Sequence, residues 1–348
     1  MKGVVYRGPG KVEVCAHLPR PRAGGPRDAL VRVTASAICG TDLHPYRGEI
    51  PAFAPGTVLG HEFTGVVVEA GAEVPFAPGE RVVASDIVAC GRCERCARGW
   101  HYQCPQVTLF GYSTVVGRPL DGGQAEYVLV PFADVVLTRC PEDLTDEQAL
   151  FVGDVLTTGY TAAHAAAITP GDVVGVVGAG PVGLLSAQCA AAFGAAHVVV
   201  SDPDPRRRSK AGEMGFTAVA PDGFTGALRG ASAGPGAAAV IEAVGTAGAL
   251  ACAMDGAGHR ATVVAVGSPS SQAAPIAAQA AFARELTLRF AVGDPIRWRE
   301  QVLSLLRAGR LDPTPVISHR LPLSEAVRGY ELFDSREALK VVLLPDAA

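Results

Sequence analysis

Four of the nine cysteines lie close together, in the pattern C-x2-C-x2-C-x7-C. They are Cys90, Cys93, Cys96 and Cys104. Four soft thiolate ligands at such short spacing suit a closed tetrahedral shell around a structural zinc ion. The odd total and the lack of a signal-peptide pattern at the N-terminus indicate a reducing, cytoplasmic compartment, where clustered cysteines bind metal and do not form disulfides. We therefore expect a structural zinc lobe over residues 90–104.

An iron–sulfur cluster is the competing interpretation of these cysteines. The run C-x2-C-x2-C and the pair Cys104-Pro105 also occur in ferredoxin patterns. In those patterns three residues precede the last cysteine, whereas seven residues separate Cys96 from Cys104. The spacing favours zinc, and this site would contribute stability and not chemistry.

A second set of metal-binding residue types is spread more widely along the chain. Cys39 lies in Cys39-Gly40-Thr41-Asp42-Leu43-His44, and His61 lies in Gly60-His61-Glu62. A catalytic zinc site needs three protein ligands and keeps its fourth position for substrate. Cys39 and His61 supply a thiolate and an imidazole, and Asp154 and Glu62 are the candidates for the third ligand.

A glycine-rich turn provides the clearest sign of a cofactor. The stretch 178–183 reads Gly178-Ala179-Gly180-Pro181-Val182-Gly183 and fits G-x-G-x-x-G between a predicted strand and a predicted helix. Gly178 allows the tight turn, Gly180 lets the backbone approach a pyrophosphate, and Gly183 permits close packing of helix on sheet. The helix that begins at Pro181 and Val182 would present its amides to the anion, so a dinucleotide site is expected.

The residue that chooses between the two nicotinamide cofactors is Asp202, at the end of the next predicted strand. Its carboxylate would accept hydrogen bonds from the adenosine ribose and repel a 2′-phosphate. Arg206 and Arg207 lie close behind it, and arginine can accept such a phosphate. We expect NAD, with NADP as the alternative and Arg207 as a further cofactor contact.

The predicted secondary structure, which positions these residues, differs between the two parts of the chain. Up to about residue 150, short strands are predicted at 29–33, 65–69, 81–84 and 125–130, separated by Gly and Pro. Beyond it, apolar strands at 173–177, 196–200, 238–242 and 261–266 alternate with helices, including one at 182–193. The last stretch has a predicted helix at 298–307 and ends in the run 339–344. The pattern predicts an α/β protein: a mostly β domain and a doubly wound parallel sheet.

Composition excludes several other classes. Charged residues make up 18% and hydrophobic residues 49% of the 348 residues, which argues against disorder. The net charge of −4 argues against a nucleic-acid-binding protein. The apolar stretch 173–200 is interrupted by five glycines and Pro181, so we expect strand, turn, helix and strand there and no membrane span.

Taken together, these motifs resemble the zinc-containing medium-chain alcohol dehydrogenases over essentially the whole chain. The resemblance rests on Gly60-His61-Glu62, the four-cysteine lobe, the glycine turn and the pattern Cys39-x-Thr41-x2-His44. It implies a GroES-like catalytic domain over 1–153 and 292–348, with a Rossmann NAD-binding domain over 154–291. Relatives of this kind are dimers or tetramers, which implies a homodimer or homotetramer.

The resemblance also implies roles at the catalytic metal. Cys39 and His61 match catalytic zinc ligands, and Asp154 falls where many members have a cysteine and others an aspartate. Glu62 corresponds to a glutamate that approaches the metal in some states. One zinc here and one in the cysteine lobe make two per subunit.

For the cofactor and the proton, the resemblance places Thr158 against the nicotinamide ring and Lys340 at the pyrophosphate. It implies a proton relay through the Thr41 hydroxyl, the nicotinamide ribose and His44 to solvent. Hydroxyl and imidazole groups suit that task because both can donate and accept a proton.

The expected activity is hydride transfer between NAD(H) and a secondary alcohol, a polyol or the corresponding ketone. The substrate pocket should lie near Phe53, Asp86 and the loop 109–110. The alternatives are a reductase acting on C=C or C=N bonds, which the presence of Thr41 disfavours, and a cofactor-binding protein without turnover.

Overall fold

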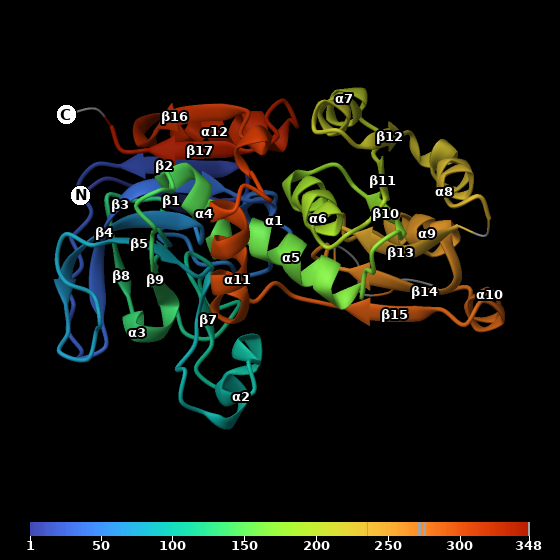
Figure 1. The fold of residues 1–348 in the computed structure, drawn as a ribbon. Coiled ribbons are helices and arrows are strands. Elements are labelled where there is room, and N and C mark those ends of the chain that lie inside the picture. The colour runs from blue at the N-terminus through green and yellow to red at the C-terminus, as the bar shows by residue number, and fades with distance from the viewer. Residues whose placement is uncertain (235, 270–272, 274–275, 347–348) are drawn as a thin grey trace. The chain divides into compact units, whose positions relative to one another are not determined.

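The computed structural model describes residues 1–234, 236–269, 273 and 276–346. The chain folds into two compact units (Figure 1). Unit 1 comprises Met1–Asp154, Asp294–Arg307 and Asp312–Ala348, and unit 2 comprises Val155–Gly293 and Ala308–Leu311. Among the described residues, no helix is long and apolar enough to cross a membrane.

Unit 1 is built mainly from strands. They are β1 (Gly3–Gly8), β2 (Lys11–Cys15), β3 (Ala29–Ile38), β4 (Phe63–Ala70), β5 (Arg81–Ala84), β6 (Ile87–Val88), β7 (Thr108–Leu109), β8 (Tyr127–Val130), β9 (Leu137–Arg139), β16 (His319–Pro322) and β17 (Val341–Leu344). The main sheet has the order β16-β17-β3-β4-β5-β9, and β8 also pairs with β3. Strands β1 and β2 form a hairpin, and β6 pairs with β7.

Short helices connect the strands of unit 1. They are α1 (Gly40–Tyr46), α2 (Glu94–Ala97), α3 (Ala133–Val136), α4 (Asp146–Leu150), α11 (Pro295–Arg307) and α12 (Ala326–Asp334), with 3₁₀ turns η1 (His101–Gln103), η2 (Phe151–Gly153), η4 (Thr314–Val316) and η5 (Leu323–Glu325). The four strands predicted before residue 150 are confirmed as β3, β4, β5 and β8, and the predicted helix 298–307 lies within α11. Within the run 339–344, strand β17 begins at Val341, so Lys340 precedes it.

The core of unit 1 holds the segment around His61 in place. Phe63, the first residue of β4, is fully buried and packs edge-on against Phe110 with ring centroids 5.1 Å apart. Strand β3 is longer than predicted, and its end at Ile38 pairs with Val341 of β17. This pairing fixes the end of β3 directly before Cys39.

Unit 2 is a parallel sheet covered by helices. Its elements are α5 (Val155–Ala165), β10 (Val173–Val177), α6 (Pro181–Ala192), β11 (His197–Ser201), α7 (Pro205–Glu213), β12 (Thr217–Val219), η3 (Pro221–Gly223), α8 (Phe224–Ser232), β13 (Ala237–Glu242), α9 (Ala247–Gly256), β14 (Ala257–Ala265), α10 (Ala278–Ala283) and β15 (Thr287–Phe290). The strand order is β12-β11-β10-β13-β14-β15, all parallel. Helices α5 and α6 lie on one face of this sheet and α8 and α9 on the other (Figure 1).

The strand order places the glycine turn where parallel sheets bind ligands. The chain runs from β10 outward to β12 and then returns to β13 on the other side of β10. At such a reversal the loops after neighbouring strands diverge and leave a crevice at their carboxyl ends. The predicted sequence of strand 173–177, turn, helix and strand is confirmed, and Gly178 follows β10 directly.

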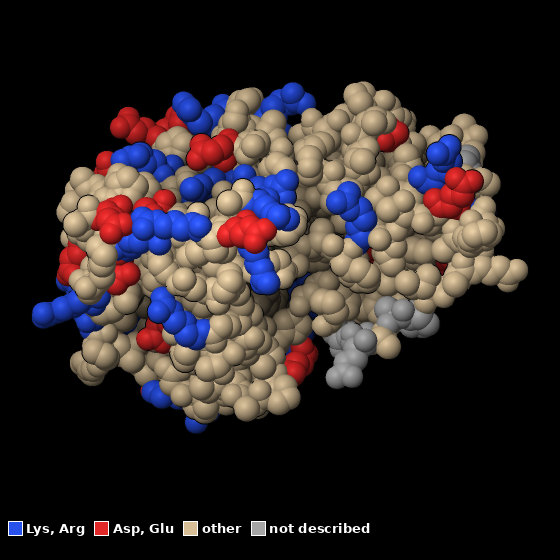
Figure 2. Space-filling view, turned by 90° about the horizontal axis from the view of Figure 1, so that it is seen from below, with Lys and Arg blue, Asp and Glu red and all other residues tan. Residues whose placement is uncertain are grey.

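The surface carries charges of both signs. On the face in Figure 2, basic side chains lie beside acidic ones, as the balance of 30 Lys and Arg against 34 Asp and Glu leads one to expect. Exposed ion pairs include Arg47 with Asp334 at 2.6 Å. Pairs of this kind contribute at most about 1 kcal/mol each.

Candidate metal centres and nucleotide-binding loop

The four clustered cysteines of unit 1 come together around one point. Their sulfur atoms all lie within 4.8 Å of one another. Cys93 Sγ lies 3.5 Å from Cys96 Sγ and 3.9 Å from Cys104 Sγ, and Cys90 Sγ lies 3.9 Å from Cys96 Sγ. Zinc with Zn–S bonds of about 2.3 Å holds tetrahedral sulfurs about 3.8 Å apart, so the cluster fits this ion.

Backbone amides of the lobe point at these sulfurs. The N–H groups of Cys90 and Gln106 each donate to Cys104 Sγ at 3.4 Å, and Cys96 N–H donates to Cys93 Sγ at 3.5 Å. The bond from Cys96 is the main reason that the pKa of Cys93 is lowered to about 7. Such donors favour the thiolate that a metal requires. All nine cysteines are free of disulfide bonds.

Cys39, His61, Glu62 and Asp154 form a second group in unit 1, with ligand atoms also within 4.8 Å of one another. Cys39 precedes α1, His61 and Glu62 precede β4, and Asp154 follows η2. Asp154 Oδ2 lies 3.3 Å from His61 Nε2 and 3.6 Å from Cys39 Sγ. A cysteine sulfur, an imidazole and a carboxylate therefore face one point, as a catalytic zinc requires.

The orientation of His61 is suited to a metal. Its Nδ1 lies 3.3 Å from Asp42 Oδ1, whereas its Nε2 faces Asp154. Both ring nitrogens are buried, and neither makes a well-aligned hydrogen bond to another residue that the structure describes. A carboxylate beside Nδ1 favours the tautomer protonated there, which leaves the Nε2 lone pair for the ion.

Sequence reasoning missed Asp42, the carboxylate that orients His61. It is fully buried, and its Oδ2 accepts the backbone N–H of Cys39 at 2.9 Å. The signal was present, because an acid three residues after the residue that begins a helix commonly bonds back to that residue's amide. Asp42 thus ties together the segments of two proposed ligands.

Burial and charge shift the protonation of the second group. Burial raises the pKa of Cys39 and raises that of Glu62 to about 7. For Asp154, burial raises the pKa, but a hydrogen bond and the charge of His61 lower it by more. For His61, burial lowers the pKa, but the charge of Asp42 and the hydrogen bonds to Asp154, Asp42 and Cys39 together raise it well above its usual value. In the metal-free protein Cys39 and His61 therefore carry protons that a bound cation would displace.

Glu62 has a buried partner from the far end of the chain. Lys340 Nζ donates to Glu62 Oε2, and both side chains are at most 1% exposed. Burial lowers the pKa of Lys340, but the hydrogen bond to Glu62 and the charges of Glu62, Cys39 and Asp154 together raise it by more. The structure thus places the Lys340 ammonium on Glu62, and its expected contact with a pyrophosphate stays a prediction.

The two residues expected in the proton relay lie on α1. Thr41 Oγ1 is 4.0 Å from Cys39 Sγ. His44 has a 23% exposed side chain, and its Nδ1 lies 2.5 Å from Glu49 Oε2. Thr41 therefore lies beside the metal group, whereas His44 reaches the surface of unit 1.

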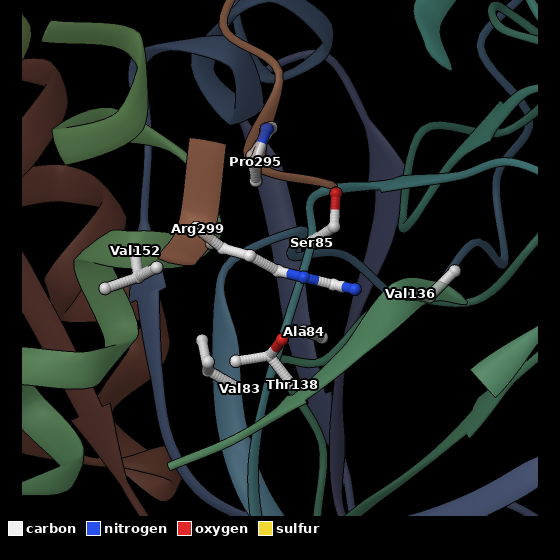
Figure 3. A pocket seen from close by; sticks show the side chains of 9 residues that line it. Val83, Ala84, Ser85, Val136, Thr138, Val152, Pro295 and Arg299 are labelled. Carbon is white, nitrogen blue, oxygen red and sulfur yellow. The ribbon is translucent and has the colours of Figure 1, made fainter. Parts of the chain in front are cut away.

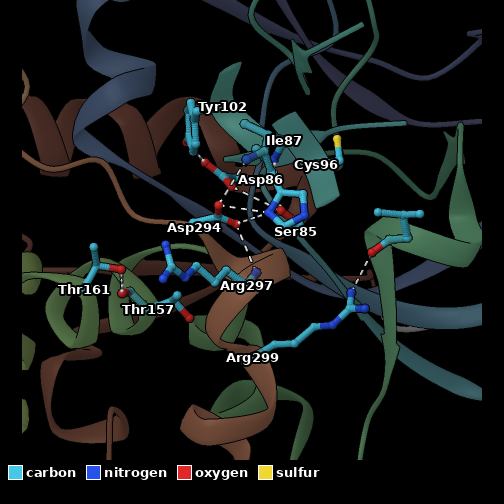
Figure 4. Close-up of polar contacts among 12 residues, drawn as sticks. Ser85, Asp86, Ile87, Cys96, Tyr102, Thr157, Thr161, Asp294, Arg297 and Arg299 are labelled. Carbon is cyan, nitrogen blue, oxygen red and sulfur yellow. Dashed lines mark hydrogen bonds and ion pairs between the residues drawn. The ribbon is translucent and has the colours of Figure 1, made fainter. Parts of the chain in front are cut away.

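Asp86 and Tyr102 link the four-cysteine lobe to the segment that carries Asp154 (Figure 4). The Tyr102 hydroxyl, from the 3₁₀ turn of the cysteine lobe, donates to Asp86 Oδ2. Asp86 is 4% exposed, and burial, followed by the charge of Asp154, raises its pKa well above the usual value. The backbone N–H of Asp86 donates to the Gly153 carbonyl at 2.9 Å. A side chain of the lobe thus contacts a segment hydrogen-bonded to the residue before Asp154.

A second contact of the lobe reaches α11. His101 Nδ1 lies 2.9 Å from both carboxylate oxygens of Asp294, which also accepts the Arg297 N–H at 3.0 Å (Figure 4). His101 and Asp294 are each 8% exposed. Sequence reasoning missed this pair because 193 residues separate its members.

A small, mostly apolar pocket lies beside Gly153 (Figure 3). Arg299 of α11 borders it and donates from Nη1 to the carbonyls of Val135 at 2.6 Å and Leu137 at 3.2 Å. The guanidinium thus attaches α11 to residues 135–137, at the start of β9.

In unit 2 the glycine turn has the geometry of the fingerprint. Gly178 has φ +101°, a conformation that side chains disfavour. A Cβ on Gly183 would lie 1.8 Å from the Gly178 carbonyl oxygen, so only glycine fits there. Gly180 precedes α6, Pro181 is its first residue, and Val182 follows. The turn and the helix N-terminus are therefore shaped for close approach of an anion.

Asp202 accepts a hydrogen bond from this turn. Its Oδ2 accepts the Ala179 N–H at 2.8 Å, and its Oδ1 accepts the Asp204 N–H at 2.8 Å. Arg207 Nη1 lies 3.9 Å from Asp202 Oδ2. The predicted acid and the predicted arginine thus lie together beside the glycine turn.

Thr158 lies in the first turn of α5, also in unit 2. A Cβ on Gly293 would lie 2.2 Å from Thr158 Oγ1, so the two residues are in close contact. Its expected place against a nicotinamide ring stays a prediction.

Comparisons with known proteins agree with both halves of this arrangement. A family model described as "Alcohol dehydrogenase GroES-like domain" matches residues 25–142, and one described as "Zinc-binding dehydrogenase" matches residues 181–308. A Mycobacterium tuberculosis protein named "Probable zinc-binding alcohol dehydrogenase" is 37% identical over 100% of this chain and 89% of its own length.

Solved structures agree as well. An alcohol dehydrogenase from Thermus sp. ATN1 has a TM-score of 0.95 and 39% identity, covering 99% of this chain and 100% of that one. A Sinorhizobium meliloti structure described as a putative zinc-binding dehydrogenase bound to NADP has a TM-score of 0.87 and 32% identity, with 99% of each chain covered. The expected GroES-like and Rossmann architecture is confirmed. The chain belongs to the zinc-dependent medium-chain alcohol dehydrogenase family, whose cofactors are zinc and a nicotinamide dinucleotide.

Proposed function

We propose that this protein transfers hydride between NAD(H) and a secondary alcohol or polyol, at a zinc ion held by Cys39, His61 and Asp154. The observation that carries the proposal is the buried group with all its ligand atoms within 4.8 Å. A zinc ion there would polarise the substrate oxygen, and a nicotinamide ring would accept the hydride. We assign the domains as 1–153 with 292–348 for catalysis and 154–291 for the cofactor.

The protein's own groups divide the remaining tasks. Cys39 and Asp154 offer two negative charges to offset a divalent ion, while Asp42 orients the neutral His61. Lys340 engages Oε2 of Glu62, and Glu62 offers a carboxylate oxygen to the group that contains Asp154. We assign Glu62 as a group that can approach the metal but does not bind it permanently.

The alcohol proton must leave a buried site. We assign its transfer to Thr41, whose hydroxyl lies beside Cys39, and to His44, which reaches the surface. A hydroxyl accepts one proton while it donates another, and an imidazole titrates near neutral pH, so these residue types suit transfer to solvent.

The decisive experiment removes one ligand. Asp154→Ala should lower the zinc content from two ions per chain to one and abolish alcohol-dependent reduction of NAD, because two remaining ligands hold zinc poorly. Asp255→Ala, at an exposed residue of α9, is the control and should retain both ions and full turnover. Two zinc ions and unchanged turnover in Asp154→Ala would refute the assignment.

For the cofactor, we propose that NAD is preferred over NADP. The support is the Asp202 carboxylate beside the glycine turn, which a 2′-phosphate would approach at an electrostatic cost. Arg207, 3.9 Å away, offsets part of that charge, so NADP is the alternative.

For the substrate, we propose an alcohol with a second polar group near the reacting carbon. The support is Asp86, a buried carboxylate within electrostatic reach of Asp154 and bonded to Tyr102. A carboxylate oxygen has a second lone pair, so Asp86 can accept a further hydrogen bond from a substrate hydroxyl, which an alkyl group cannot donate.

We propose a reducing cytoplasmic compartment, which suits the nine free cysteines. We further propose that the protein forms a homo-oligomer through strand β15. Strand β15 ends the sheet order of unit 2, and Phe290 on it is 69% exposed. Phe282 and Val292, close to it in sequence, are 86% and 60% exposed. An exposed apolar strand edge is a template for pairing with a second copy.

A further inference from the structure

A hydrogen-bonded network of three buried polar side chains lies behind His61 in unit 1. Tyr330 from α12, Gln124 from the segment before β8 and Asp42 from α1 are all 0% exposed. The Tyr330 hydroxyl donates to Gln124 Oε1 at 2.8 Å, and Gln124 Nε2 donates to Asp42 Oδ2 at 3.2 Å. Asp42 Oδ1 in turn lies 3.3 Å from His61 Nδ1. The network thus ends at His61, whose other ring nitrogen, Nε2, faces Asp154.

The Gln124 amide can take only one orientation in this setting. Its nitrogen faces two acceptors, Asp42 Oδ2 and the Ala37 carbonyl at 3.1 Å. Its oxygen faces the Tyr330 hydroxyl, which must therefore donate to it. Turning the amide over would place its oxygen against a carboxylate and a carbonyl, so the network has a defined direction. Asp42 consequently receives a donated hydrogen at Oδ2.

Gln124 also holds the backbone beside His61. Its N–H donates to the Leu59 carbonyl at 2.9 Å. A Cβ on Gly60, which has φ +98°, would lie 2.4 Å from Gln124 Cγ. The glutamine therefore packs directly on the residue before His61 and acts on it from two sides.

Burying these groups is costly unless they serve some interaction. A buried amide or hydroxyl must be hydrogen-bonded, and apolar side chains of the same volume would fill the core without that requirement. The side chains of Tyr330 and Gln124 hydrogen-bond to each other, to Ala37 and to Asp42, and among these partners Asp42 is the one whose side chain lies beside His61. The network is therefore best explained by what it does to Asp42.

We propose that Gln124 and Tyr330 are positioning residues of the catalytic metal centre. They hold the Asp42 carboxylate in one orientation, so that Oδ1 engages His61 Nδ1 and Nε2 is left for the ion. The inference rests on the proposed zinc site at Cys39, His61 and Asp154. Hydrogen-bond partners of metal-bound histidines typically alter metal affinity by about 10–100-fold, and a group one bond further out should alter it less.

The test compares zinc and cobalt binding in full-length variants. Tyr330→Phe removes one hydroxyl and keeps the ring, and Gln124→Met removes the amide and keeps the length. Tyr46→Phe is the matched control, because its ring contacts Tyr330 at a centroid distance of 5.4 Å. The readouts are zinc affinity by chelator competition and the visible spectrum of cobalt exchanged into the catalytic site, with the four-cysteine site left loaded.

We expect zinc affinity at the catalytic site to fall up to about 10-fold in Gln124→Met and by less, about 3-fold, in Tyr330→Phe, which lies one bond further out, with an altered cobalt spectrum in both. Tyr46→Phe and the cysteine-lobe zinc should not change. A purely structural role would lower the melting temperature and leave affinity and spectrum unchanged, which would overturn the inference. If the unmutated protein binds no metal at this site, the proposed function fails instead.

Discussion

Replacing Asp294 by alanine tests how the cysteine lobe is held. The carboxylate accepts from His101 Nδ1 at 2.9 Å, from the His101 N–H at 3.3 Å and from the Arg297 N–H at 3.0 Å. Asp294 therefore caps the first turn of α11 and at the same time anchors η1, which lies between two cysteines of the lobe. Alanine removes both functions and leaves a buried imidazole N–H without a partner.

The size of the effect follows from these contacts. Loss of a helix-capping side chain costs about 1 kcal/mol. Loss of a hydrogen bond between a charged group and a buried partner costs about 2 kcal/mol. If the lobe must break both the helix cap and this hydrogen bond to open, their loss lowers the free energy of local opening by about 3 kcal/mol. The lobe then opens roughly 150-fold more often. Asp294→Asn keeps a neutral acceptor, so the increase in opening frequency should be about a tenth of that in Asp294→Ala.

The assay is the rate at which one equivalent of zinc passes to a colorimetric chelator when the lobe opens. We expect the rate to rise roughly 100-fold in Asp294→Ala and about 10-fold in Asp294→Asn, if opening precedes release. Zinc release as slow as in the unmutated protein in both variants would show that the carboxylate does not anchor the lobe. Equal acceleration in both variants would show that charge, and not the acceptor geometry, is what matters.

Four further predictions concern the site, the cofactor, the substrate and assembly. Burial raises the pKa of Cys39. Burial lowers the pKa of His61, but the charge of Asp42 and the hydrogen bonds to Asp154, Asp42 and Cys39 together raise it by more. Both residues therefore carry protons without metal, and zinc affinity at the catalytic site should rise with pH, by up to about 100-fold per unit below both pKa values. Chelator competition between pH 6.5 and 8 measures that slope, and a flat profile would contradict it. NADH should bind at least about 10-fold more tightly than NADPH, and Asp202→Ala should narrow the gap; equal affinities in the unmutated protein would remove the role of Asp202. Asp86→Ala should lower kcat/KM for vicinal diols roughly 10-fold relative to simple secondary alcohols, and an unchanged ratio would exclude a substrate contact. Phe290→Asp should yield monomers in light scattering, whereas an unaltered mass would place the interface elsewhere.

Sequence alone revealed the features whose parts lie close together along the chain. The four cysteines of the lobe and the glycine turn each occupy fewer than twenty residues, so their spacing already limits the geometry. The alternation of apolar strands and helices after residue 150 likewise predicted a parallel sheet, because each period of the pattern matches one element. The structure bears out these expectations with only small changes in element bounds.

Only the tertiary structure revealed which distant residues satisfy the buried polar groups. Lys340 reaches Glu62 across 278 positions, Tyr330 reaches Gln124 across 206, and Asp294 reaches His101 across 193. No local spacing links such pairs, because each exists only after two separate segments are packed into one core. Burial then makes the partner obligatory, since an unpaired polar group there would cost more than the contact contributes. The residue types capable of binding zinc could thus be found in the sequence, whereas the groups that orient and hold them were decided by the fold.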